Sequence, residues 1–147
     1  MKSRIFLASF IIFVSYCWIS CNDNPYKQGQ GLYTSQCANC HMENGSGLEG
    51  AIPPLAQSDY IAEDPLRMAC IIRYGQQDTI VVNGRTYNQP MAANNLLTEF
   101  QITNIINYIN HAWGNDYGVV KHQDVRNLLD ACEAEKRLSH PYGFVSQ

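Results

Sequence analysis

Three residues that could do chemistry lie within five positions of one another: Cys37, Cys40 and His41, in the stretch QCANCHM. This spacing is compatible with three chemistries, namely zinc binding by thiolates, dithiol redox exchange and covalent attachment of haem. The sequence around the three residues distinguishes among these chemistries.

Zinc binding and dithiol exchange fit the surrounding sequence poorly. A zinc site needs two further ligands with metal spacing, but His111, His122 and His140 are isolated in the chain. Redox dithiols of the thioredoxin type follow a strand, whereas residues 29–36, just before Cys37, have a helical pattern. Haem attachment accounts for all three positions, because two thiols add to the haem vinyl groups and the adjacent histidine binds the iron.

The N-terminal segment predicts export. Lys2 and Arg4 precede an apolar run over residues 5–19, which is typical of a secretory signal peptide. Residues 18–21 resemble a bacterial lipoprotein box, with Trp18 where an aliphatic residue is usual, so we expect lipid on Cys21 and a membrane-anchored periplasmic protein. An uncleaved signal anchor and simple secretion with Cys21 unmodified are the alternatives, and all three export the domain.

Length and charge limit the class of protein. The 147 residues suit one compact domain with modest additions, and 46% apolar with 16% charged residues is an ordinary globular composition. Removal of residues 1–20 takes away two of the ten basic residues and leaves 13 acidic ones, so the net charge changes from −3 to −5. An acidic chain argues against nucleic acid as a partner.

The stretch from Gly29 to about Gly114 resembles a class I cytochrome c domain. Gly29 and Tyr33 precede the CxxCH motif at the positions where that family has a glycine and an aromatic residue, and Tyr108 is similar to the aromatic residue that meets them. The resemblance implies an all-α fold of about four to five helices around one covalently bound haem c with its iron. It also implies a short hairpin before the loop that carries the distal ligand, and here the chain adds a C-terminal helix.

The resemblance also implies which residues bind the haem on its proximal side. Cys37 and Cys40 would form the thioethers, and His41 would bind the iron. In the family, a proline at the position of Pro53 offers its carbonyl to the other ring nitrogen of that histidine, which orients the ring. Leu55, two positions later, is expected to bind haem as well. Alternatively, the prolines of this stretch simply stiffen a loop.

Met91 is the expected distal ligand, because methionine gives a high-potential electron-transfer haem and Met91 lies in the loop where the family has its ligand. The local pattern departs from the family, since Pro90 precedes the methionine instead of following it. Met68 is expected in the core of a helix that begins near Pro65. His111 is a rival ligand, but its position within a helix favours a surface role.

The remaining sequence predicts the elements that position these ligands. Asn83-Gly84 is a hairpin turn signal. Thr98 and Gln101 form a capping box, which predicts a helix that ends at Gly114. Its predicted apolar face consists of Phe100, Ile102, Ile105, Ile106, Ile109 and Trp113. A further helix is predicted over 121–138, with a buried stripe of Val125, Leu128, Leu129 and Cys132. We expect this helix to wrap the core, and docking of a partner protein is the alternative.

Four segments are therefore expected: a signal peptide at 1–20, a linker at 21–28, the cytochrome domain at 29–114 and an extension at 115–147. Cys70 and Cys132 are the unassigned cysteines after the signal. Export permits a disulfide between them, while two small buried apolar residues are the other interpretation, which we favour.

The expected function is one-electron transfer without catalysis of bond chemistry. Exported dehydrogenases, respiratory complexes and terminal oxidases are the expected partners. The alternatives are a haem subunit of a larger oxidoreductase and, from another class, a haem peroxidase or sensor with an open sixth position on the iron. A CxxC module without haem is a third alternative.

Overall fold

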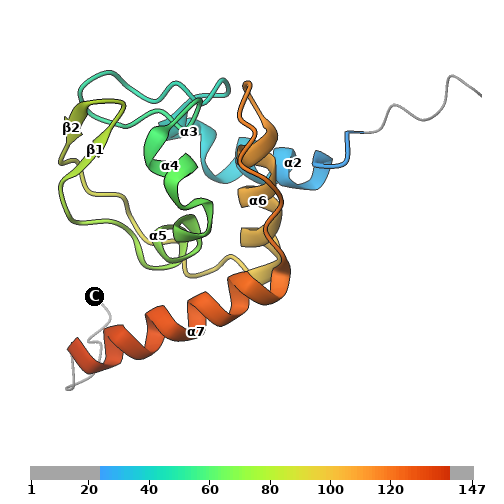
Figure 1. Ribbon diagram of the computed structural model, residues 1–147, viewed down its shortest axis with the longest axis vertical. Helices are drawn as coiled ribbons and strands as arrows, with labels where there is room; N and C mark the ends of the chain where they lie inside the picture. The colour runs from blue at the N-terminus through green and yellow to red at the C-terminus, as the bar shows by residue number, and fades with distance from the viewer. Residues whose placement is uncertain (1–23, 140–147) are drawn as a thin grey trace, which may run out of the picture.

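The chain folds into short helices and one two-stranded hairpin, in a computed structural model that describes residues 24–139 (Figure 1). The signal peptide and Cys21 lie outside these residues. In chain order, the elements are α2 Lys27–Gln36, α3 Ala38–His41, α4 Asp59–Glu63, the 3₁₀ turn η1 Pro65–Arg67, α5 Met68–Tyr74, β1 Ile80–Val82, β2 Arg85–Tyr87, α6 Glu99–His111 and α7 His122–Ser139. The mainly helical class, the hairpin and the additional C-terminal helix are thus confirmed.

Helices α2 and α6 cross closely, and Gly29 makes the crossing possible. A Cβ atom on Gly29 would overlap the backbone carbonyl oxygen of Asn104 and would lie 2.8 Å from the Cβ atom of Tyr108. Next to this contact, the rings of Tyr33 and Tyr108 lie 5.4 Å apart. The expected roles of the glycine and of the two aromatic residues in helix crossing are therefore confirmed.

Helix α6 begins as predicted but ends early. Thr98 and Gln101 form both hydrogen bonds of the capping box. The helix ends at His111, and Trp113 has a φ of 54°, so the predicted end at Gly114 was three residues too late. Phe100 is 62% exposed and its ring lies against that of His122, so its placement on the buried face was wrong.

The four isoleucines of α6 form the centre of the core. Ile102, Ile105 and Ile106 are completely buried, and Ile109 is nearly so. Met68 and Ile72 of α5 and Val125 and Leu129 of α7 belong to the same buried cluster. The prediction that Met68 is a core residue is confirmed.

A hairpin follows α5 and leads to the loop that contains Met91. Gly75 ends α5 with a φ of 81°. Strand β1 pairs with β2 in antiparallel register, with Ile80 opposite Tyr87, and the turn residues Asn83 and Gly84 both have positive φ values. Two positive φ values in a two-residue loop are what an Asn-Gly hairpin turn requires, so the predicted turn is confirmed.

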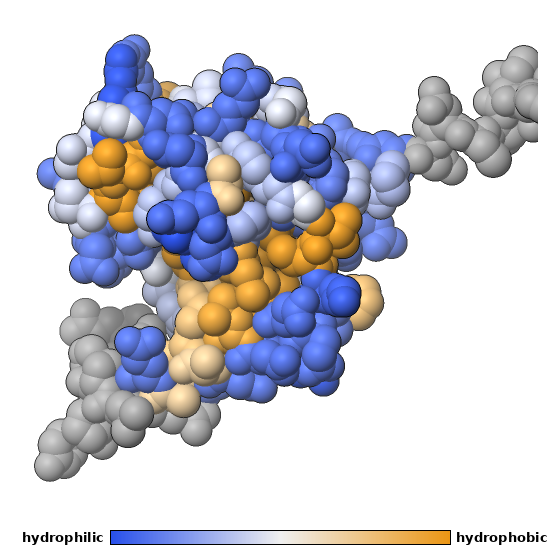
Figure 2. All heavy atoms as spheres, in the orientation of Figure 1, coloured by the Kyte–Doolittle hydropathy of each residue, from blue (hydrophilic) through white to orange (hydrophobic). Residues whose placement is uncertain are grey.

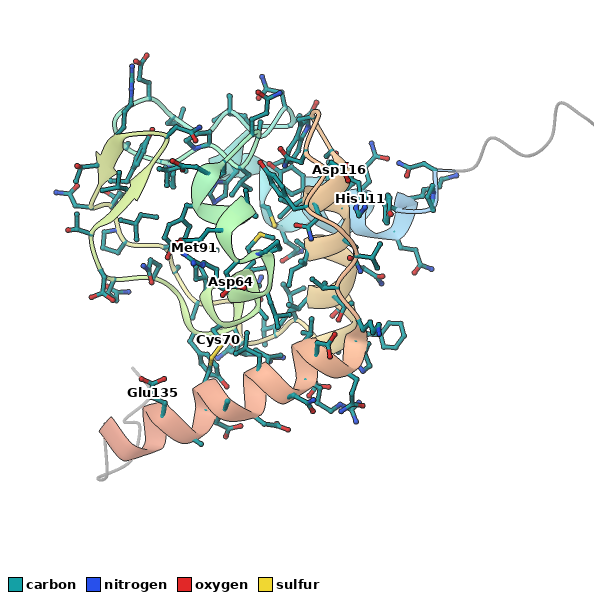
Figure 3. All side chains as sticks on the ribbon, in the orientation of Figure 1. Asp64, Cys70, Met91, His111, Asp116 and Glu135 are labelled. Carbon is teal, nitrogen blue, oxygen red and sulfur yellow. A yellow bond between two sulfur atoms is a disulfide. The ribbon has the colours of Figure 1, made fainter. Side chains whose placement is uncertain are left out.

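Helix α7 lies across the bottom of the domain in the view of Figure 1 and packs against α5 and α6. Figure 2 shows apolar surface directly above α7 on the visible face. The predicted wrapping of the core is confirmed. Cys70 on α5 forms a disulfide with Cys132 on α7, with Cα atoms 6.3 Å apart (Figure 3). The interpretation of two unpaired buried cysteines was therefore wrong, because packing of α7 on α5 brings together residues that are 62 positions apart.

Candidate haem site

The CxxCH motif lies between two helices. Cys37 follows the end of α2, and its backbone carbonyl accepts hydrogen bonds from the amides of Cys40 and His41, at 3.1 and 3.0 Å. This single turn brings both thiols and the imidazole to adjacent positions on α3. Both cysteines have free thiols, with Cys37 half-buried and Cys40 exposed. Because a helix precedes the motif, its setting differs from the strand that precedes a thioredoxin-type dithiol.

The imidazole of His41 is held by one nitrogen. Its Nδ1 atom lies 3.3 Å from the carbonyl oxygen of Pro53, and the residue is 9% exposed. Burial lowers the pKa of His41, although the contact with the Pro53 carbonyl acts in the opposite direction. The neutral imidazole is therefore favoured, with the proton on Nδ1 donated to Pro53 and the lone pair on Nε2. This is the form in which a histidine binds a metal ion.

The loop that carries Pro53 is fixed by its own backbone. The amides of Leu55 and Ala56 both donate to the carbonyl of Gly45, at 2.8 and 3.0 Å. Gly45 has a φ of 69° and lies beneath the ring of Trp113, where a Cβ atom would come within 2.5 Å of Cε3. The half-buried Leu55 packs against the core cluster. The loop thus holds the Pro53 carbonyl at a defined place beside α3.

The thiol of Cys37 is a weak acid in the folded chain. Burial, and then the neighbouring charge of Cys40, raise the pKa of Cys37 to about 11. A thiol reacts as its thiolate, so this group is almost completely protonated at neutral pH. Its environment is apolar, which suits a thioether better than a free thiolate.

The three candidate distal ligands, Met91, Met68 and His111, have different surroundings in the structure. Met91 is half-buried against the core, and its backbone exchanges two hydrogen bonds with Gln76, at 2.8 and 3.0 Å. Met68 is 5% exposed within the core. His111 stacks on the ring of Tyr26 at 4.3 Å, and its Nδ1 atom contacts the carbonyl of Asn107 at 2.8 Å. In Figure 3, His111 and Met91 lie on different sides of α6.

These residues fit a covalently bound haem. The chain provides two neighbouring free thiols, a buried imidazole oriented through Nδ1, and a thioether side chain on a loop whose backbone is fixed. Cys37 and Cys40 would hold the porphyrin, while His41 and Met91 would hold the iron.

Within residues 24–139, no helix is long and apolar enough to cross a membrane.

The fold and this donor set define a class I cytochrome c domain. Residues 26–113 match the family described as cytochrome c, and the chain belongs to that family. It carries a covalently bound haem c with iron and transfers electrons rather than acting as an enzyme.

Two curated relatives illustrate the range of this similarity. The chain is 38% identical to cytochrome c-552 of Thermus thermophilus over 91 residues, which cover 59% of this chain and 69% of that protein. It is 30% identical to the cytochrome c subunit of an alcohol dehydrogenase (quinone) from Gluconobacter oxydans over 114 residues. That alignment covers 69% of this chain and only 23% of the dehydrogenase subunit.

Sequence reasoning missed two residues near the site. Gly45 accepts the hydrogen bonds that close the Pro53 loop, and its positive φ was not anticipated. Asn115, the first residue of the expected extension, forms hydrogen bonds with Leu55 and Gln57 of the same loop. A glycine four residues after His41 is the local signal that could have indicated the positive φ, whereas Asn115 carried no local signal.

Proposed function

We propose that this domain is a one-electron carrier in which His41 and Met91 are the axial ligands of the haem iron. The contact of His41 Nδ1 with the Pro53 carbonyl carries the proposal, because it leaves Nε2 for the metal and orients the ring. Bound haem c supplies one-electron redox chemistry, and the protein holds and shields it. Ligation by two side chains leaves no coordination site for a substrate, which disfavours the peroxidase and sensor alternatives.

The backbone around Met91 supports its role as the distal ligand. Its hydrogen bonds with Gln76, and that of the Asn94 amide to the Ile72 carbonyl at 2.8 Å, attach the loop to the end of α5. A Cβ atom on Gly75 would lie 2.6 Å from the carbonyl oxygen of Met91, so the loop packs directly on the helix end. A ligand on a fixed backbone needs little reorganisation between the two iron oxidation states.

The test compares two leucine variants of the haem-loaded protein. Met91→Leu should abolish the weak near-infrared sulfur-to-iron band and lower the reduction potential, because the thioether ligand is lost. Met68→Leu is the matched control, since it conserves volume in the core and should keep the band. Persistence of the band in Met91→Leu, or ready binding of carbon monoxide by the unmodified protein, would overturn the proposed ligation.

A second candidate is a haem subunit of a larger oxidoreductase. It is favoured by the similarity to proteins named as cytochrome c subunits of an alcohol dehydrogenase (quinone). Purification of the tagged full chain from its native membranes distinguishes the two. A stoichiometric complex with a dehydrogenase would favour the subunit, whereas recovery of the cytochrome alone with rapid electron exchange would favour the free carrier. Respiratory complexes and terminal oxidases are the other proposed partners.

We further propose that residues 1–20 direct export to the periplasm and that lipid on Cys21 anchors the haem domain, 29–114, and its extension, 115–147. The support is the sequence pattern of basic residues, apolar run and terminal cysteine. Mass spectrometry of the mature N-terminus should find a diacylglyceryl group on Cys21. In Cys21→Ser, this group should be absent and the protein should leave the membrane fraction; an unmodified Cys21 in the original chain would contradict the anchor.

A further inference from the structure

Asn115 lies just beyond the part of the chain that matches the family, and all hydrogen-bonding groups of its amide are used. Its Nδ2 atom donates to the carbonyls of Ile109, at 2.7 Å, and Leu55, at 3.0 Å. Its Oδ1 atom accepts from the amide of Gln57, at 2.6 Å. The residue is 6% exposed. One buried side chain therefore joins the C-terminal end of α6 to a loop about 60 positions earlier in the sequence.

The turn that follows α6 directs the side chain of Asn115 into the protein. Gly114 has a φ of 82°, and the amide of Asn115 donates to the carbonyl of Ala112 at 2.9 Å. A φ in this range favours glycine, so the turn depends on Gly114. A buried polar side chain with complete hydrogen bonding fixes its partners in one arrangement, because any displacement would leave buried groups unpaired.

The loop that Asn115 holds is the one that carries the Pro53 carbonyl. Leu55 and Gln57 flank Ala56, so Asn115 contacts the backbone on both sides of that residue. The Gly45 carbonyl holds the loop on its other side. Gln57 has a φ of 50°, an unfavourable conformation for a residue other than glycine, which needs support from its surroundings. Without the Asn115 side chain, the loop would lose these two hydrogen bonds to the segment that follows α6.

We propose that Asn115 is a positioning residue for the haem ligand His41: by fixing residues 55–57, it keeps the Pro53 carbonyl on the Nδ1 proton of the imidazole. This inference rests on the proposed ligation of iron by His41. The side-chain hydrogen bonds of Asn115 go to Ile109, Leu55 and Gln57 and not to His41, so its effect passes through the loop backbone. It extends the site into the C-terminal extension, beyond residue 113.

The chain offers a matched control for this role. Asn107 on α6 also forms two hydrogen bonds through its side chain, donating to the carbonyl of Val120 at 3.0 Å and accepting from its amide at 2.8 Å. Both asparagines attach the extension to α6, but Asn107 has no hydrogen bond to residues 55–57. Replacement of either by alanine should reduce stability, whereas only the replacement of Asn115 should affect the imidazole.

The experiment measures solvent exchange of the His41 Nδ1 proton by NMR in the haem-loaded protein, under conditions where every variant is folded. In Asn115→Ala, exchange should be at least about tenfold faster than in the original chain, which corresponds to about 1.4 kcal/mol. In Asn107→Ala, it should stay close to the original rate. The near-infrared band of the distal ligand should persist in both variants. Equal exchange rates in the two variants would overturn the inference.

Two further measurements keep the outcome clear. If Asn115→Ala fails to mature, Asn115→Ser takes its place in the experiment. The serine hydroxyl can bind water but is too short to join Leu55 and Gln57, so exchange of the His41 Nδ1 proton should be accelerated in this variant as well. A wild-type spectrum without an iron-shifted His41 resonance would overturn the proposed ligation itself, and this inference with it. An iron-shifted His41 resonance whose Nδ1 proton exchanges at the original rate in both Asn115 variants would overturn only the positioning role.

Discussion

Cys70 and Cys132 form a disulfide that joins α5 to α7, and α5 is also the helix on whose end the Met91 loop is docked. The hydroxyl of Tyr74 adds a hydrogen bond to the carbonyl of Leu129 on α7, at 3.4 Å. The C-terminal extension is therefore attached covalently to the helix that supports the loop of Met91, the proposed distal ligand, while Asn115 contacts the loop beside His41, the proposed proximal ligand. The extension thus acts as part of the haem domain.

Removal of the disulfide should destabilise the protein. The double variant Cys70→Ala/Cys132→Ala should lose about 2–4 kcal/mol of unfolding free energy, because the bond restricts a long loop in the unfolded chain. Guanidinium unfolding of the haem-loaded protein measures the loss. A reducing agent should shift the midpoint of the original chain and leave that of the double variant unchanged; equal midpoints without reductant would contradict this prediction.

Two glycines of α2 should respond in opposite directions to replacement by alanine. Gly29→Ala should cost about 1–3 kcal/mol, because the added methyl group overlaps the Asn104 carbonyl where α2 crosses α6. A methyl group on Gly31 would have no neighbouring atom within 4 Å, so Gly31→Ala should stabilise the helix by about 0.5–1 kcal/mol. Thermal unfolding of the two variants compares them directly. Similar changes in both would argue against the close crossing.

The capping box of α6 should contribute measurably to stability. Thr98 Oγ1 accepts from the Gln101 amide at 3.3 Å, and Gln101 Oε1 accepts from the Thr98 amide at 2.8 Å. Thr98→Ala should therefore cost about 1 kcal/mol in urea unfolding. The exposed Thr79, replaced by alanine, should change stability by less than about 0.5 kcal/mol. A cost at Thr98 no larger than that at Thr79 would contradict a stabilising cap.

Two apolar residues of α6 should contribute different amounts to the free energy of unfolding, although helical periodicity places both on the same face. Ile105 is completely buried, so Ile105→Ala should cost about 2–5 kcal/mol. Phe100 is mostly exposed and packs on the edge of α7, so Phe100→Ala should cost less than about 1 kcal/mol. Chemical denaturation of both variants tests this, and a comparable loss at Phe100 would contradict the exposed position.

The features that were predicted correctly depend on residues close together in the chain. The Asn83-Gly84 hairpin turn and the capping box at Thr98 each involve a few consecutive residues, whose backbone preferences specify the local geometry. The approach of Pro53 to His41 was expected from the family resemblance and is present at 3.3 Å. The ligand role of Met91 remains a prediction.

The features that were not predicted depend on contacts between distant segments. Helical periodicity placed Phe100 and Trp113 on the buried face of α6, but the helix ends at His111 and α7 leaves Phe100 at the edge. The sequence left a Cys70–Cys132 disulfide open as one of two interpretations, and nothing local marked Asn115 as a partner of residues 55–57. The sequence by itself determined the attachment motif, the helical class and the local turns. Only the tertiary structure decided which side chains from the extension support the site, because such contacts arise when distant helices pack together.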